Sequence, residues 1–268
     1  YGTANTMCCL AEALGLTLPG AALVPAVYAE RTRLAFETGK KIVELVNKDI
    51  TTRDVITERS LENAIAVLNA TGGSTNAVMH LTAVARELDI DSDIMMALFD
   101  KMNHQVPLVA KVNPASKYNM EDFCRAGGVP QVMREIASLL HMDVMTVTGK
   151  TLRENLENHP ENHPDRNVIR TMADPFSASG GVAILRGNLA PEGCVTKPSA
   201  IDPSMHVFTG KARVFDGEEA AEETILSGGI HPGDVLVIRY EGPKGGPGMR
   251  EMYKAMKYLY GRGLSKTT

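Results

Sequence analysis

Apolar residues recur at intervals of three and four through the first 90 residues of the chain. The first such repeat consists of Met7, Leu10, Ala11 and Leu14. This spacing places the four side chains on one face of a helix, which Gly15 can end. The same spacing predicts further amphipathic helices over residues 36–46, 61–68 and 78–88.

Two short apolar runs interrupt the helical pattern, at residues 106–110 and 143–147. Runs of this length are typical of buried strands. Helices that alternate with short buried strands indicate an α/β fold, because the helices can cover the faces of a sheet. We therefore expect the first part of the chain to form a helix-rich α/β/α sandwich.

The pattern changes after residues 159–165, a polar stretch with two prolines that we interpret as a linker. Beyond it, Gly, Pro and Asp separate four predicted strands, over residues 181–185, 194–197, 211–215 and 234–240. Helices are predicted over residues 218–226, with Asp216 near the N-cap, and 249–260. We expect two domains, residues 1–165 and 166–268, of which the second is smaller and resembles a β-barrel.

Composition excludes some classes of function. The net charge of −4 offers no basic field to a nucleic acid, and no apolar run approaches the roughly 20 residues that span a bilayer. The chain begins at Tyr1 without a signal peptide, so we expect a segment of a longer chain with an incomplete first domain. None of the four cysteines forms a C-x-x-C pair, which favours buried thiols and a reducing, cytoplasmic compartment.

Two patterns resemble ligand sites but lack a required feature. Thr148-Gly149-Lys150-Thr151 matches the end of a phosphate-binding loop, but that motif needs a glycine where Val144 stands. His159 and His163 have the spacing of zinc ligands on a helix, but the proline after each of them disfavours a continuous helix. We interpret the first pattern as a turn before a helix and the second as exposed linker residues.

The stretch Thr71-Gly72-Gly73-Ser74-Thr75-Asn76 joins the end of one predicted helix to the start of the next. Paired glycines let backbone N–H groups approach a ligand closely, and a helix N-terminus supplies donors and a positive dipole end. Such a turn can bind a carboxylate through Ser74 and Thr75. The alternative is that the glycines only end one helix and the hydroxyl residues only cap the next.

The stretch from Gly242 to Glu251 contains four glycines and two prolines directly after a predicted strand. So many glycines cost backbone entropy, which is usually tolerated where the backbone must lie against a ligand. Glu251 follows at the start of a helix, and its carboxylate suits Mg²⁺. The alternative is a tight turn with a glutamate that the helix dipole favours.

Six sequence blocks follow one another along the chain: Gly2-Thr3-Ala4-Asn5-Thr6-Met7, Ala70-Thr71-Gly72-Gly73-Ser74-Thr75-Asn76-Ala77, Ala126-Gly127-Gly128-Val129-Pro130, Thr146-Val147-Thr148-Gly149-Lys150-Thr151, Gly187-Asn188-Leu189-Ala190-Pro191 and Glu241-Gly242-Pro243-Lys244-Gly245-Gly246-Pro247-Gly248-Met249-Arg250-Glu251-Met252. In this order they resemble the dihydroxy-acid dehydratase and sugar-acid dehydratase family. The resemblance covers essentially the whole chain, and the last block is the most specific.

The resemblance implies a hydro-lyase in which a 2,3-dihydroxy acid loses water and becomes a 2-keto acid, as in branched-chain amino-acid biosynthesis. It implies an iron–sulfur cluster and Mg²⁺ that polarise substrate oxygens, a swivelling second domain, and a homodimer when the protein is full length. One alternative is a sugar-acid dehydratase acting on arabinonate, xylonate or a phosphogluconate. An alternative from another class is a non-catalytic anion-binding module.

The family's site residues carry over only in part. Glu251 matches the glutamate that binds magnesium. The resemblance places the cluster cysteines and the other magnesium ligands before Gly2, so Cys8 and Cys9 are not expected to bind the cluster. It places the catalytic serine beyond Thr268. We therefore expect no catalytic residue in this segment, and no activity from the segment alone.

Overall fold

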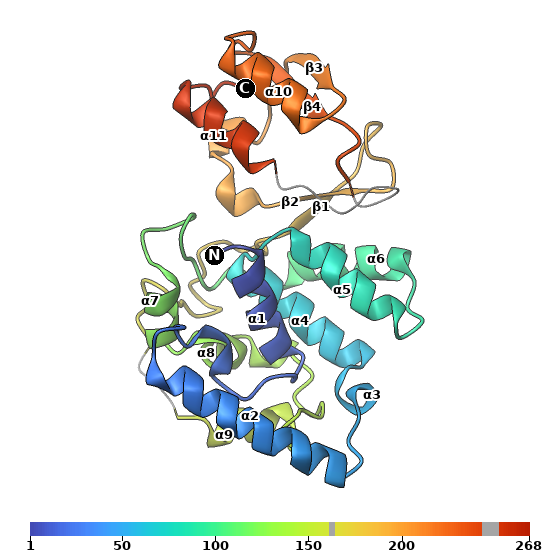
Figure 1. Ribbon diagram of the computed structural model, residues 1–268, viewed down its shortest axis with the longest axis vertical. Coiled ribbons are helices and arrows are strands. Elements are labelled where there is room, and N and C mark those ends of the chain that lie inside the picture. Colours follow the sequence, from blue (N-terminus) through green and yellow to red (C-terminus); the bar gives the residue numbers. More distant parts are fainter. Residues whose placement is uncertain (161–163, 243–251) are drawn as a thin grey trace. The chain divides into compact units, whose positions relative to one another are not determined.

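The computed structural model describes residues 1–160, 164–242 and 252–268 (Figure 1). The predicted metal ligand Glu251 lies outside these residues. The chain divides into two compact units, Tyr1–Ala200 and Ile201–Thr268.

Helix α4 (Glu58–Thr71) lies at the centre of the first unit. It begins with a capping box, in which Thr57 and Ser60 exchange side-chain to backbone hydrogen bonds, and it ends where Gly72 adopts the left-handed conformation. Apart from Glu62, every residue from Leu61 to the end of the helix is buried. The helices that pack around α4 are α1 (Thr3–Ala13), α5 (Asn76–Arg86), α6 (Ser92–Gln105) and α8 (Gly128–Glu135) (Figure 1).

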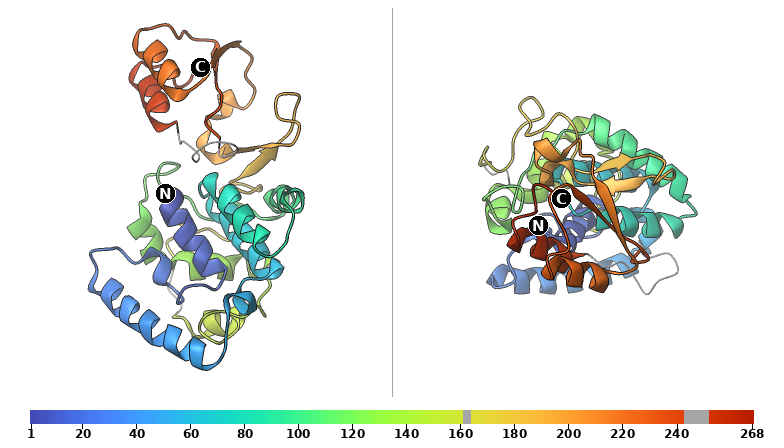
Figure 2. Two further views of the ribbon diagram at one scale, coloured as in Figure 1. Left: turned by 45° about the vertical axis from the view of Figure 1, so that its right-hand side comes forward. Right: turned by 90° about the horizontal axis from the view of Figure 1, so that it is seen from above.

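The remaining elements of the first unit surround this core. They are η1 (Ala21–Leu23), α2 (Ala29–Asn47), α3 (Thr52–Val55), α7 (Met120–Arg125), η2 (Ala137–Leu139), α9 (Leu152–Asn158) and η3 (Pro198–Ala200). Strands β1 (Ala183–Leu185) and β2 (Cys194–Thr196) form an antiparallel pair, and β1 packs against α6. In the left view of Figure 2, the blue helix α2 lies at the outer edge of this unit.

The four helices predicted in the first 90 residues are confirmed as α1, α2, α4 and α5. In α2, however, the residues of the predicted apolar repeat do not face the core. Phe36, Val43 and Val46 are 69%, 59% and 72% exposed, and Leu45 is the buried residue of this helix. Periodicity thus identifies the helix without identifying the side that packs on the rest of the unit.

The two strands predicted in the first half of the chain are wrong. Residues 106–110 are buried and form only isolated bridges, from Leu108 to Ser177 and from Ala110 to Ile169. Their backbone bonds go to several partners, and the N–H groups of both Val109 and Ala110 donate to the carbonyl of Ala70. Residues 143–147 likewise form one bridge, from Met145 to Thr151. No sheet therefore lies at the centre of the described part of the first unit.

The second unit contains a parallel pair of strands joined by a helix. Strand β3 (Lys211–Phe215) pairs in register with β4 (Asp234–Ile238), and α10 (Glu218–Leu226) connects them. The other elements are η4 (Pro203–Met205) and α11 (Tyr253–Gly261), and the small core consists of Ile225, Ile230, Ala255 and Leu264. The strands over 211–215 and 234–240 and the helix over 218–226 are confirmed, with β4 shorter than predicted.

The structure supports an α/β fold that is rich in helix. Strands β1 and β2 confirm the predictions over residues 181–185 and 194–197 with shorter bounds. The described residues form two sheets of two strands each and no closed sheet, so the barrel-like domain is not confirmed. None of the described helices has the length and apolar composition needed to cross a bilayer.

Candidate functional site

The turn between α4 and α5 carries the two residues that are predicted to bind substrate. Thr75 is the N-cap residue of α5, and its side chain makes no capping hydrogen bond. Ser74 precedes it, and both residues are half-buried. The structure therefore places Ser74 and Thr75 at the N-terminus of a helix, as the sequence predicts.

Gly73 allows helix α1 to pack tightly against this turn. A Cβ atom at this position would lie 2.7 Å from Cγ2 of Thr6 and 2.8 Å from Cδ1 of Leu68. Both distances are shorter than real Cβ contacts, so a larger residue would push α1 away from α4. The glycine thus brings the hydroxyl groups of α1 within reach of Ser74.

A hydroxyl cluster, formed by Thr3, Thr6, Ser74 and Asn76, joins α1 to the turn. The Oγ atoms of Thr3 and Ser74 lie 3.0 Å apart, and the Nδ2 group of Asn76 donates to Oγ1 of Thr3 at 2.7 Å. The backbone N–H of Ser74 donates to Oγ1 of Thr6 at 3.0 Å. These bonds fix the orientation of Ser74 from two sides.

The same turn also performs the capping role that we gave as the alternative. Gly72 ends α4 in the left-handed conformation, and Oγ of Ser74 accepts a hydrogen bond from the backbone N–H of Asn76 at 3.3 Å. Capping and ligand binding are compatible, because a hydroxyl oxygen can accept one bond while its proton is donated elsewhere. The binding role of Ser74 and Thr75 stays a prediction.

Tyr1 extends the set of neutral polar groups at the end of α4. Its hydroxyl lies 3.1 Å from Oγ1 of Thr71. Burial, the main cause, raises the pKa of the Tyr1 hydroxyl well above its ordinary value, and burial likewise raises the pKa of the nearby Cys9 thiol. These groups therefore stay protonated and can donate or accept hydrogen bonds, but they do not act as bases near neutral pH.

Two residues that the sequence patterns do not single out lie beside this corner. The ammonium group of Lys197 lies 5.9 Å from the centroid of the Tyr1 ring. The Oγ atom of Ser199 is buried and has no hydrogen-bond partner among the described residues. The local sequence Lys197-Pro198-Ser199 contains no motif that could have identified them, because their neighbours come from distant parts of the chain.

The described residues do not by themselves fit Mg²⁺ or an iron–sulfur cluster. They contain no group of three or more His, Cys, Asp or Glu side chains placed to share a metal ion. A cluster needs thiolate ligands, whereas the raised pKa of Cys9 keeps this buried residue a thiol. The described part of the chain therefore contains no complete set of ligands for either group, and the role of Glu251 stays a prediction.

Glu241, the first residue of the glycine-rich block, belongs to the described part of the chain. Its carboxylate oxygen accepts a hydrogen bond of 2.8 Å from the backbone N–H of Glu218, the first residue of α10. A carboxylate at this position is favoured by the helix dipole. The bond holds Glu241, which follows strand β4, at the N-terminus of α10.

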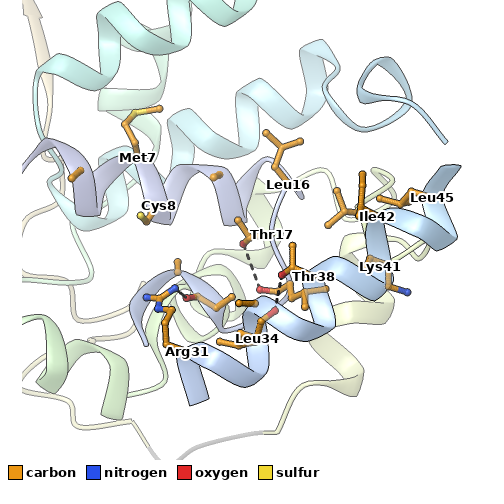
Figure 3. A pocket seen from close by; sticks show the side chains of 17 residues that line it. Met7, Cys8, Leu16, Thr17, Arg31, Leu34, Thr38, Lys41, Ile42 and Leu45 are labelled. Atoms are coloured by element: carbon orange, nitrogen blue, oxygen red, sulfur yellow. Dashed lines mark hydrogen bonds between the residues drawn. The ribbon is translucent and has the colours of Figure 1, made fainter. Parts of the chain in front are cut away.

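An apolar pocket of about 740 Å³ lies between α1 and α2. In Figure 3, Met7 and Cys8 from α1 lie on one side of it, and Leu34, Ile42 and Leu45 from α2 lie on the other. The described lining includes Arg31 and Lys41 as charged residues and no carboxylate or imidazole. A pocket of this composition suits apolar groups, so we do not assign it to the binding of a dihydroxy acid.

Comparison with known proteins decides the family. The family model described as dihydroxy-acid/6-phosphogluconate dehydratase N-terminal matches residues 1–155, and the corresponding C-terminal model matches residues 167–268. The chain belongs to the dihydroxy-acid/6-phosphogluconate dehydratase family. The predicted linker over residues 159–165 falls between the two matched segments. The division of the chain into two compact units falls elsewhere, between residues 200 and 201. The domain limit at residues 165 and 166 stays a prediction.

Curated members of this dehydratase family are similar to nearly the whole chain. Proteins named dihydroxy-acid dehydratase from Acetivibrio thermocellus and Caldanaerobacter subterraneus subsp. tengcongensis are 52% and 53% identical to it over 98% of its length. The protein of that name from Methanosarcina barkeri is 49% identical over the same share. The chain spans about half of the length of these relatives, 47% in each case.

Proposed function

We propose that this chain forms part of a dihydroxy-acid dehydratase, a hydro-lyase that converts a 2,3-dihydroxy acid into a 2-keto acid in branched-chain amino-acid biosynthesis. The observation that carries the proposal is the identity of about 50% to proteins of that name along almost the entire chain. We propose a small-molecule substrate, a cytoplasmic location and a homodimer for the intact protein.

The reaction sets the requirements for the site. A proton leaves C2, the C–O bond at C3 breaks, and the departing hydroxide takes up a proton and leaves as water. The resulting enol then takes up a proton at C3 and loses the proton of its C2 hydroxyl group to become the keto acid. The described residues offer neutral hydrogen-bond donors and acceptors but no base at the hydroxyl cluster. We therefore propose that this chain binds and orients the substrate, and that the proton-accepting group lies outside it.

Ser74 and Thr75 are the proposed substrate-binding residues. Ser74 is held by α1, and no hydrogen bond joins the Thr75 hydroxyl to the first turn of α5. A carboxylate or hydroxyl at the N-terminus of α5 would be favoured by the helix dipole and by these side chains. Glu251 is the proposed magnesium ligand, and the ligands of the iron–sulfur cluster are proposed to lie outside this chain.

A sugar-acid dehydratase is the second candidate, because the matching family models also name 6-phosphogluconate dehydratase. The test uses the intact protein, purified without air, and measures its iron, its sulfide and the keto acid formed from 2,3-dihydroxyisovalerate and from arabinonate. Turnover of the first acid supports the main proposal. Turnover of arabinonate alone favours the second candidate, and a protein without turnover or bound iron contradicts both in favour of an anion-binding module.

A further inference from the structure

Helix α2 buries little of its surface within the described part of the first unit. Of its 19 residues, Leu45 is buried, Leu34, Lys41 and Glu44 are half-buried, and the others are exposed. Leu34, Ile42 and Leu45 line the pocket of about 740 Å³ between α2 and α1 (Figure 3). Even the side of α2 that faces the unit is therefore separated from α1 by a hollow along part of its length.

The apolar side of α2 is much wider than the edge that packs. At 3.6 residues per turn, its apolar residues span an arc of about 200°, from Leu34 through Ile42 and Val46 to Phe36. We call this side the apolar arc, and in this fully described helix Arg31 is the one charged residue within it. A surface helix of a globular protein typically has an apolar stripe of about 100°. The excess width indicates that a second partner packs on α2.

The opposite side of α2 carries charges that pair with one another. Nζ of Lys40 lies 2.9 Å from the carboxylate of Glu37, and Nζ of Lys48 lies 2.6 Å from that of Glu44. Ion pairs of this spacing on a helix are typical of a side that faces water. The charged side of α2 is thus suited to solvent, whereas the side with Phe36 is not.

The length of the relatives and the position of Tyr1 indicate what the partner is. The chain spans 47% of the length of the relatives from Acetivibrio thermocellus and Caldanaerobacter subterraneus, so more than half of a protein of that length lies outside it. One wall of the pocket consists of Ala4, Met7 and Cys8 from α1. Ala4 stands three residues after Tyr1, a stretch that spans at most about 11 Å. A segment that precedes Tyr1 would therefore lie beside the pocket where it joins this chain.

We propose that the segment preceding Tyr1 in the intact protein packs on the apolar arc of α2 and fills the pocket between α2 and α1. The inference rests on the proposed function, which makes this chain part of a longer dehydratase. Apolar side chains of that segment would remove Phe36, Ile42 and Val43 from water, which is the main driving force for such packing. The charged side of α2 would remain in contact with solvent.

The first test measures how accessible the apolar arc is in the intact protein, by the rate of thiol alkylation. Cys8 is an exposed thiol in the pocket, and Val43→Cys places another on the apolar arc. Glu37→Cys is the matched control, because Glu37 is exposed on the charged side of the same helix. Each rate is read from the labelled peptide by mass spectrometry and divided by the rate of the same thiol in urea-unfolded protein.

We expect the relative rates of Cys8 and of Val43→Cys to be at least about tenfold lower than that of Glu37→Cys, because a covered thiol reacts only when the structure opens locally. The second test identifies the partner. Phe36→p-azidophenylalanine should form, on irradiation of the intact protein, a cross-link to a peptide that precedes Tyr1 in the same chain.

Equal relative rates at the three positions would overturn the proposal. A cross-link to a second copy, seen at twice the mass of the chain, would assign the surface to a dimer contact and overturn it too. The same holds for a cross-link to a segment beyond Thr268, and for slow alkylation without a cross-link to the preceding segment.

The proposed function fails in a different way, as missing keto acid in the turnover assay. An active protein with equal alkylation rates would contradict the packing of α2 alone. An inactive protein with the expected cross-link would keep this packing and contradict the proposed function.

Discussion

The Oγ atoms of Thr3 and Ser74 lie 3.0 Å apart and connect the start of α1 with the turn between α4 and α5. The backbone of Ser74 is bonded to Thr6 on the same helix, so α1 holds this residue through two side chains. A binding group that is fixed before its ligand arrives loses less entropy on binding. The position of α1 therefore matters for the proposed site as well as for the core.

Replacement of Ser74 by alanine should weaken substrate binding. We expect KM of the intact protein for 2,3-dihydroxyisovalerate to rise about tenfold, because one hydrogen bond to a charged or polar group is lost. The free energy of unfolding should fall by about 1 kcal/mol. Steady-state kinetics test this, with Ser138→Ala as the control, since Ser138 is exposed and its described contact is the sulfur of Met172 at 3.9 Å. An unchanged KM in Ser74→Ala would remove this residue from the site.

Replacement of Gly73 by alanine should destabilise the first unit. The added methyl group would lie 2.7 Å from Thr6 and 2.8 Å from Leu68, and overpacking of this kind typically costs about 1–3 kcal/mol. Gly39→Ala is the matched control, because Gly39 lies inside α2 and a methyl group there meets no described atom within 4 Å. That control should gain about 0.5–1 kcal/mol. If urea unfolding gives Gly73→Ala and Gly39→Ala the same free energy of unfolding, the close packing of α1 is contradicted.

Glu12 gives the chain a specific pH dependence. Its buried carboxylate accepts hydrogen bonds from the backbone N–H groups of Gly20 at 2.6 Å and Ala22 at 3.0 Å, and burial, the larger effect, raises its pKa to about 7. Because this value exceeds the ordinary 4.5 of the unfolded chain, the folded state binds the proton more tightly. The contribution of Glu12 to stability is therefore complete below pH 4.5 and is lost as the pH rises through 7, by about 3 kcal/mol.

Glu12→Gln removes the titrating proton and should flatten this dependence. As the pH rises from 5 to 8, the free energy of unfolding of the wild type should fall relative to that of Glu12→Gln. Glu44→Gln is the control, because hydrogen bonds from Lys41 and Lys48 lower the pKa of Glu44 to about 2, so that it does not titrate in this range. A wild-type protein and a Glu12→Gln variant with the same pH profile would show that Glu12 is already charged at pH 5.

Glu251→Ala should lower the affinity of the intact protein for Mg²⁺ and abolish its activity, because a carboxylate ligand of the ion would be lost. The measurement is the Mg²⁺ concentration that gives half-maximal rate, together with metal content. Glu223→Ala is the control, since Glu223 is an exposed residue of α10. If the dependence on Mg²⁺ is the same in Glu251→Ala as in the wild type, the assignment is wrong.

The helices could be predicted because their core-facing residues repeat within a short window. In α4, Leu61, Ala64, Ile65 and Leu68 are all fully buried. The run over residues 106–110 could not be assigned in this way. Its burial is real, but the backbone hydrogen bonds of residues 108–110 go to Ala70 and to residues 170–177, which no local pattern identifies. A buried apolar run therefore predicts burial more securely than it predicts a strand.

In the candidate site, too, only the residues that are neighbours in the sequence could be predicted from it. The turn at Ser74 could be found because glycines, hydroxyl residues and an asparagine stand together in the sequence. The hydroxyl groups of Thr3 and Thr6 reach it only through the packing of α1 on α4, and Lys197 only through its contact with Tyr1. Those relationships depend on the fold.

The most direct test of the account is the rate at which the intact protein, purified without air, forms 2-ketoisovalerate from 2,3-dihydroxyisovalerate. We predict turnover that requires Mg²⁺ and is faster than turnover of arabinonate. A protein that contains iron and sulfide but forms no keto acid from 2,3-dihydroxyisovalerate would contradict the proposed function.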